Sequence, residues 1–158
     1  MSKILSAEEA LHRAAALCST AERCSYDLRE KLANWGISHT DTEKIIRRLS
    51  DEKFLDDNRF CTAFARDKFR FSGWGRVKIA YALRQKRLPD SSIDEALSSI
   101  DEDTYRETLQ RLLRDKERTL KDEDNYTRYA KLFRFATSRG FEPVSYTHLR
   151  AHETRSNL

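Results

Sequence analysis

Residues that interrupt helices are scarce in this sequence. There are two prolines and four glycines among 158 residues, and the alternation of β-branched and polar residues that is typical of strands is nearly absent. These shortages argue against a β-rich fold. The sequence therefore predicts an all-α protein whose amphipathic helices each bury one apolar stripe.

The sequence also lacks the marks of membrane proteins and of disulfide scaffolds. No apolar run approaches the ~20 residues that a membrane helix needs, and the N-terminal segment has acidic residues and no cleavage-site pattern. The three cysteines, Cys18, Cys24 and Cys61, are an odd number. Together these features predict a cytoplasmic protein in a reducing compartment, with cysteines that act as small apolar fillers.

Recognisable catalytic motifs are missing as well. There is no phosphate loop, no GxSxG and no CxxC pair, and His12 and His39 are isolated. Asp56 and Asp57 could suggest metal-binding carboxylates, but one of them as a helix cap explains the pair more simply. We expect a protein that is not an enzyme and that uses no metal or cofactor.

Charge is abundant and unevenly distributed. The net charge is +4, yet the segment from Arg66 to Arg87 has eight bases and one acid, and the segment from Asp90 to Asn125 has twelve acids and six bases. This pattern predicts a surface with one basic and one acidic side. Charges on ordinary solvated helix faces remain the alternative.

Capping signals divide the chain into short helices. Three segments have a hydroxyl residue followed three positions later by a glutamate, namely Ser6–Glu9, Thr40–Glu43 and Ser92–Glu95. Ser25 is predicted to cap a further helix, and Asp56 or Asp57 another. Gly36 and Gly140 stand where helices are expected to end.

Apolar residues at helical spacing give the expected buried faces. In the basic helix they are Val77, Ile79, Ala80 and Leu83, and in the last clear helix they are Tyr126, Tyr129, Leu132, Phe133 and Ala136. Leu32, Leu83 and Ala136 occupy equivalent positions in three copies of one pattern. A period near fifty residues predicts an elongated, curved array of three-helix, helix-turn-helix-like units.

The repeat predicts three units and a tail. The units are residues 1–53, residues 54–100, which are basic, and residues 101–143, which lack a closing helix. Residues 144–158 have little apolar material for such a helix, and we expect them to be a non-native tail. We therefore give no role to His148 and His152, although a spacing of four residues could seat a metal.

The segment from Phe54 to Leu88 resembles the central signature of the RecX family, the bacterial regulators of the RecA recombinase. The residues that carry this resemblance are Asp56, Asp57, Arg59, Phe60, Phe64, Gly75, Ile79 and Leu83, and in the first repeat Ser25, Leu28, Lys31, Leu32, Gly36, Ile45, Ile46 and Leu49. The resemblance covers about residues 8–143. Arg87 stands where the family usually has glycine, which leaves the conformation of that turn open.

The resemblance implies a regulator that lies in the helical groove of the RecA–DNA filament and modulates, with inhibition as the expected direction, recombinase and coprotease activity. Charge clustering, and not the family, selects the candidate contact residues: Arg66, Lys68, Arg70, Arg76, Lys78, Arg84, Lys86 and Arg87. Lys78 should be well exposed, because it points away from the stripe of Ile79 and Leu83. We expect Arg76→Glu combined with Arg84→Glu to weaken filament binding without unfolding the chain.

Two other functions stay open. A direct binder of single- or double-stranded DNA would use the same basic residues on phosphates, and Phe69, Phe71 and Trp74 could stack on bases. Packing between repeats is the expected role of these aromatics. A generic helical scaffold is the third hypothesis. In each case a self-capped array is expected to be a monomer.

Overall fold

The computed structural model describes residues 5–143, and this part of the chain is entirely helical, as predicted. Its eight α-helices are α1 (Ala7–Thr20), α2 (Ser25–Asn34), α3 (His39–Asp51), α4 (Asp57–Ser72), α5 (Arg76–Gln85), α6 (Asp90–Ser98), α7 (Glu102–Arg118) and α8 (Asn125–Ser138). The predicted tail lies outside the described residues.

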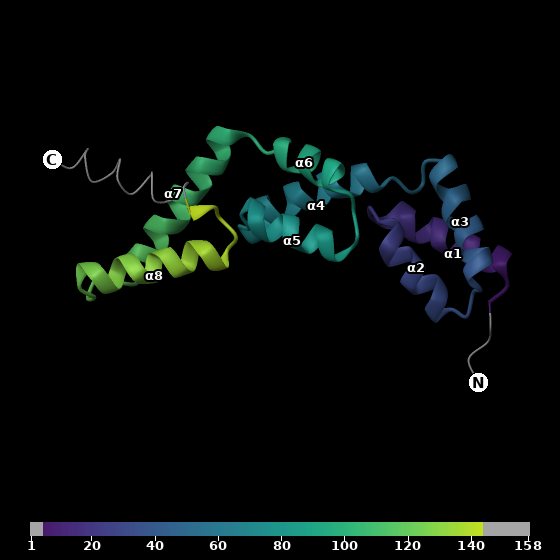
Figure 1. Ribbon diagram of the computed structural model, residues 1–158, viewed down its shortest axis with the longest axis horizontal. Helices are drawn as coiled ribbons and strands as arrows, with labels where there is room; N and C mark the ends of the chain where they lie inside the picture. The colour runs from purple at the N-terminus through teal and green to yellow at the C-terminus, as the bar shows by residue number, and fades with distance from the viewer. Residues whose placement is uncertain (1–4, 144–158) are drawn as a thin grey trace.

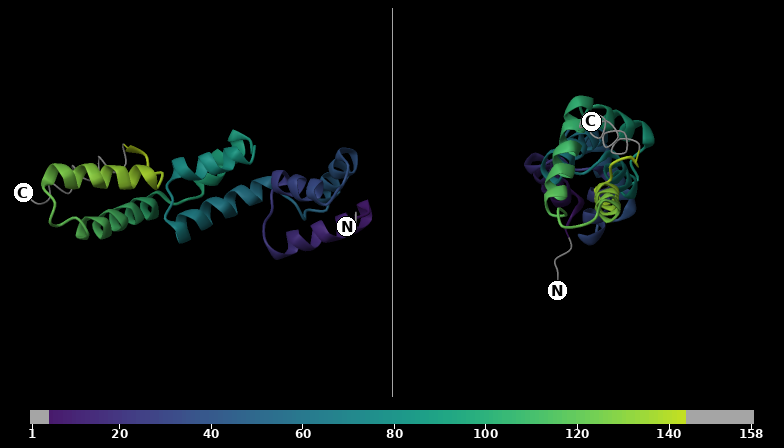
Figure 2. Two further views of the ribbon diagram at one scale, coloured as in Figure 1. Left: turned by 90° about the horizontal axis from the view of Figure 1, so that it is seen from below. Right: turned by 90° about the vertical axis from the view of Figure 1, so that its left-hand side faces the viewer.

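The helices form three groups that follow one another along the long axis of the molecule (Figure 1). We call α1–α3 the first unit, α4–α6 the second unit, and α7 with α8 the third unit. The left view in Figure 2 shows the same elongated arrangement, and the right view looks along the long axis. The tandem array of helical units is thus confirmed, whereas the boundaries at residues 53, 100 and 143 stay predictions.

Side-chain caps begin several helices. Ser6 caps α1, as predicted, and of the two candidates Asp56 and Asp57 it is Asp56 that caps α4, with acceptor distances of 3.1 Å from the Glu9 amide and 3.0 Å from the Arg59 amide. Such caps satisfy backbone donors that have no partner within the helix. Asp101 and Asp124 cap α7 and α8 in the same way.

Three predicted caps are wrong. The cap of α3 is Ser38, which accepts from the Asp41 amide at 3.2 Å, so Thr40 lies within the helix. Helix α6 begins directly after Pro89, whose ring fixes φ near the helical value. Ser92 is therefore a buried residue of α6 that donates to the Asn58 side chain. Ser25 is the first residue of α2, and Cys24 precedes it as the cap without a side-chain hydrogen bond.

Two hydrophobic cores hold the array. The first unit has its own core, made of Ala10, Ala14, Leu28, Leu32, Ile45, Ile46, Leu49 and Leu55. The second and third units share a larger one, which also includes Cys24 of the first unit, and in it Phe69 of α4 stacks on Tyr105 of α7, with 5.6 Å between ring centroids. Phe141 packs on the same tyrosine ring at 5.2 Å. The last two units therefore form one continuously packed body.

The expected buried faces are narrower than predicted. Val77 is 54% exposed, and on α8 Tyr126 is 85% exposed. Tyr129 and Phe133 of α8 are exposed too, so that Leu132 and Ala136 alone are its buried residues. Helical spacing places all of these apolar residues near one face, but each of these helices touches the core along a single narrow stripe.

A backbone junction joins the second and third units. The Gly75 amide donates to the Arg139 carbonyl at 2.7 Å, and the Val77 amide donates to the Gly140 carbonyl at 2.9 Å. A Cβ atom on Gly75 would come within 2.5 Å of the Gly140 backbone. Glycine at these positions thus permits a main-chain approach that any side chain would block.

Polar side chains join the first and second units. Asp57 accepts from the Ser25 amide at 2.8 Å and so satisfies the first turn of α2 from the neighbouring unit. Arg59 pairs with Glu22 at 2.6 Å. The double aspartate therefore has two structural roles: its first residue caps α4, and its second holds α2.

Two of the three cysteines are buried in the shared core, as expected for apolar fillers. Burial raises the pKa of Cys24 to about 12 and that of Cys61 to about 11. Burial also raises the pKa of Cys18, which is only partly covered.

Thiol titration with a coloured disulfide at pH 8 should therefore show one accessible and two protected cysteines. Only the thiolate reacts, and with a pKa of about 11 roughly one Cys61 thiol in a thousand is ionised at that pH. Denatured protein should release all three thiols at one rate. Two or three fast thiols in the folded protein would contradict the closed core.

Candidate functional site

The eight basic residues do not form one patch. Helix α5 begins beside Arg139 and Gly140 of the third unit and ends beside Asp27 of the first, a run of about 15 Å for its ten residues. The basic residues on the last half of α4 and the start of α5 therefore lie toward the third unit. Those at the end of α5 lie toward the first unit.

Arg76 is held inside the junction of the second and third units. Its guanidinium pairs with Glu102 at 2.8 Å and with Glu142 at 3.5 Å, and it lies 3.9 Å from the centroid of the Tyr105 ring. The Tyr105 hydroxyl accepts from the Arg76 amide and donates to Glu142. Burial raises the pKa of this phenol, which keeps it a neutral donor. Arg76 is therefore a structural residue.

Lys86 also forms an ion pair within the protein. Its Nζ donates to both carboxylate oxygens of Asp27 at 2.9 Å, and both side chains are more than two-thirds buried. The pair links the end of α5 to the first turn of α2. Because an ion pair of this kind is costly to break from one side, Lys86 is poorly suited to a partner that must compete with Asp27.

Lys68 and Lys78 converge on one indole ring. Their Nζ atoms lie 4.8 Å and 4.6 Å from the centroid of the Trp74 ring. The expectation that Lys78 is well exposed is wrong, since its stem packs against the Gly140 backbone and its side chain is partly buried. Within residues 5–143, neither lysine forms an ion pair with a carboxylate.

The remaining four candidates are exposed arginines. Arg66 and Arg70 lie one turn apart on α4, and the Arg70 guanidinium lies over the Phe71 ring. Arg84 makes a loose pair with Asp90 at 3.4 Å, in which both side chains are more than half exposed. Arg87 lies over the Tyr26 ring. These four guanidinium groups are the ones that a partner can reach.

Arg87 has the left-handed backbone that a glycine would adopt there, with φ at 58°. The equivalent turns at Gly36 and Gly140 have φ values of 83° and 92°. The turn geometry is therefore conserved across the three copies within this chain, although only two of them have glycine. A non-glycine residue in this region is strained by about 1–2 kcal/mol.

The three candidate stacking residues, Phe69, Phe71 and Trp74, differ in exposure, which the sequence did not predict. Phe69 is buried in the shared core, as expected, and Trp74 packs edge-on against Phe64 at 6.3 Å. Phe71, by contrast, is 75% exposed. Phe71 continues a row of aromatic residues on α4 to the surface. The spacing of Phe60, Phe64 and Phe71 by four and seven residues is the sequence pattern that predicts such a row.

Residues 5–143 hold no cluster of three or more histidine, cysteine or carboxylate side chains placed to bind a metal ion. In the same range, no helix is both long and apolar enough to cross a membrane. His148 and His152 lie outside the described residues.

Comparison with known proteins identifies the family. The sequence model of RecX, second three-helix domain, matches residues 56–97. The chain is 36% identical over 122 residues to the regulatory protein RecX of Clostridium tetani, and it spans 54% of that relative's length. It is 34% identical to the regulatory protein RecX of Vibrio campbellii over 90% of this chain and 89% of the relative.

The fold agrees with solved structures. The crystal structure of RecX from Lactobacillus salivarius superposes with a TM-score of 0.83 over 94% of this chain and 97% of that chain, at 17% identity. At that identity the likeness concerns the fold alone. The chain spans about half the length of the clostridial relatives that it matches. On the Vibrio match, which covers nearly all of both proteins, this chain belongs to the RecX family.

Proposed function

We propose that this protein is a non-enzymatic, cytoplasmic, monomeric regulator that binds the RecA–single-stranded DNA filament and inhibits its recombinase and coprotease activities. The observation that supports it most is membership of a family whose curated relatives are named regulatory proteins. An elongated array suits a long partner, because weak contacts at successive units add through effective concentration.

The four exposed arginines are the proposed contacts of this activity. Arg66 and Arg70 contact the filament at the end of the second unit that faces the third, and Arg84 with Arg87 at the end that faces the first. Arg76 and Lys86 are not among the proposed contacts, because Glu102 and Asp27 of the protein itself neutralise their charges. Exposed charges of this kind act mainly on association rate and selectivity.

The test is the ATPase activity of RecA on single-stranded DNA with increasing amounts of this protein. We expect inhibition at protein levels well below those of RecA. Arg66→Glu with Arg70→Glu should raise the concentration for half-inhibition by about tenfold, since each reversal replaces an attraction with a repulsion. Arg111→Glu with Arg114→Glu, on an exposed part of α7, makes the same charge change and should leave inhibition unaltered.

Unchanged ATPase activity at excess protein would refute the proposal. Equal effects of the two double variants would instead show that net charge, and not the α4 arginines, governs inhibition.

Direct binding to nucleic acid is the second candidate, because exposed guanidinium groups also suit phosphate. On single strands it would show as a fall in log affinity of about 0.7 per neutralised phosphate for each tenfold rise in salt. Tight, salt-dependent binding to bare DNA, with no effect on RecA beyond competition for sites, would favour it.

A further inference from the structure

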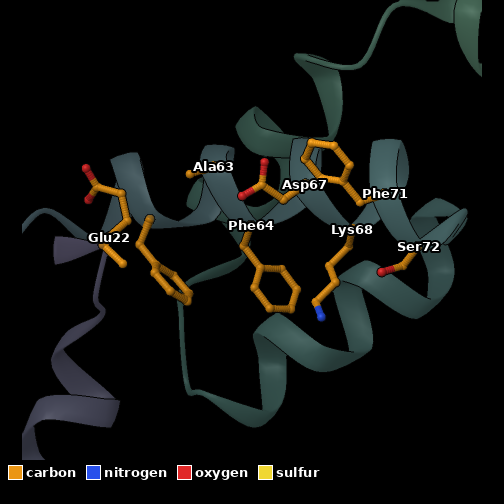
Figure 3. A pocket seen from close by; sticks show the side chains of 9 residues that line it. Glu22, Ala63, Phe64, Asp67, Lys68, Phe71 and Ser72 are labelled. Carbon is orange, nitrogen blue, oxygen red and sulfur yellow. The ribbon is translucent and has the colours of Figure 1, made fainter.

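A hollow of about 500 Å³ lies on the outer face of α4. Figure 3 shows Phe64 and Lys68 on one side of the helix axis, and Asp67 and Phe71 on the other. Glu22, from the link between α1 and α2, closes the end nearest the first unit. No described segment of the chain fills this space.

Three aromatic rings line the hollow, and they differ in solvent exposure. Phe60 is almost fully buried, Phe64 is half-buried and Phe71 is 75% exposed. From Phe60 to Phe71 the helix advances about 17 Å, which is three turns. A second helix laid along this face would present its own apolar side chains at intervals of three and four residues to these rings.

Unneutralised positive charge lies at one end of the hollow. Lys68 lines it, and the Lys68 and Lys78 ammonium groups share the Trp74 ring at 4.8 Å and 4.6 Å. The two nitrogens are thus within about 10 Å of one another, where like charges repel. A carboxylate beside these ammonium groups reduces this repulsion and gains charge-assisted contacts.

We propose that this hollow is a docking site for an amphipathic helix of a partner protein, with apolar side chains on Phe64 and Phe71 and an acidic residue beside Lys68, at the end nearest Lys78. A protein helix fits better than a nucleic-acid strand, because the Asp67 carboxylate lines the same hollow and would repel a phosphate backbone, whereas the Glu22 carboxylate is paired with Arg59. The inference does not depend on RecA being the partner.

The probe is a fluorescein-labelled peptide of about 16 residues, long enough to form a helix, with leucines along one face and two glutamates in its first turn. Its fluorescence anisotropy should report saturable binding to the full-length protein. Phe71→Ala should weaken binding about tenfold or more, because the partner loses the area of an aromatic ring. Tyr81→Ala removes an exposed aromatic of α5 that does not line the hollow, and should have no effect.

The charged end has its own test. Lys68→Gln with Lys78→Gln keeps the side-chain stems and should weaken binding about tenfold, but only for the acidic peptide and not for a version with glutamine in place of both glutamates. Lys44→Gln with Lys121→Gln, both on exposed positions elsewhere, is the matched control. Circular dichroism confirms that each variant is folded.

Several outcomes would overturn the inference: no saturable binding of the peptide, equal binding of a scrambled peptide, or equal losses in the lysine and control variants. Binding of labelled oligothymidylate that depends on Phe71 and Lys68, without binding of the peptide, would assign the hollow to single strands instead. The assay contains no recombinase. If the peptide does not bind but the protein still inhibits the RecA ATPase, only the docking site is refuted. If the peptide binds but the protein does not inhibit the ATPase, only the proposed function is refuted.

Discussion

Gly140→Ala is expected to lower the free energy of unfolding by more than about 3 kcal/mol. The new Cβ would lie 2.3 Å from the Cβ of Lys78 and 2.6 Å from its backbone nitrogen. The residue also has a φ of +92°, which an alanine rarely adopts. The clash involves the main chain, so rotation of a side chain cannot relieve it. The start of α5 must move away from the third unit, and the hydrogen bonds at Gly75 and Val77 are lost with it.

Gly73→Ala is the matched control. Gly73 also has a positive φ, of 66°, but the nearest atoms to its added Cβ are side-chain atoms of Arg139 and Leu112 at 3.4 Å and 3.5 Å. The expected loss is the backbone strain alone, about 1–2 kcal/mol. Urea unfolding followed by circular dichroism measures both variants. Equal losses would show that the close approach of α5 and Gly140 is not a constraint on stability.

Arg76→Glu is expected to lower the free energy of unfolding by about 2 kcal/mol, less than for a fully buried pair because Glu102 is 64% exposed. The arginine now neutralises Glu102 and Glu142 beside the Tyr105 ring. Reversal of its charge would leave three carboxylates together in a partly buried site. The double variant Arg76→Glu with Arg84→Glu is therefore expected to disturb the fold, contrary to the prediction made from the sequence, and it is a poor test of filament binding.

Arg84→Glu is the control for this prediction, since the exposed pair of Arg84 with Asp90 should contribute less than about 1 kcal/mol. Adding Glu102→Arg to Arg76→Glu should restore part of the loss, because it reverses both members of the closest pair. Thermal unfolding compares the four proteins. A wild-type melting temperature for Arg76→Glu would show that the ion pairs at this junction contribute nothing.

The architecture could be predicted from the sequence because the same apolar pattern recurs in three copies, and each copy supports the assignment of the others. Leu32, Leu83 and Ala136 recur at nearly constant spacing, and each is buried beside the turn that follows it. Capping was predicted less well, because Ser38 and Thr40 both offer a hydroxyl near the start of α3 and only the folded loop decides between them. Helix α6 likewise begins directly after Pro89, which lies three residues before Ser92, the predicted cap.

The candidate site was predicted only as a list of charges. Nothing near Arg76 or Lys86 in the sequence shows that they are neutralised, because their carboxylates lie in other units, at Glu102, Glu142 and Asp27. Lys78 was misjudged for a related reason. Helical spacing places it off the stripe of its own helix, but it takes no account of Gly140, which covers it from the third unit.

The two cores make the molecule mechanically uneven. Five helices share packing and a main-chain junction, whereas the first unit is tied to them by Cys24, which is buried in the same core, and by polar contacts of Asp27, Glu22 and Asp57. The partly exposed pair of Arg59 with Glu22 weakens as salt screens it, whereas buried apolar contacts do not. We expect the molecule to bend most readily between the first unit and the other two, which form a longer arm. A body of this kind can follow a helical partner whose pitch changes, because its shorter arm adjusts while the longer arm remains seated.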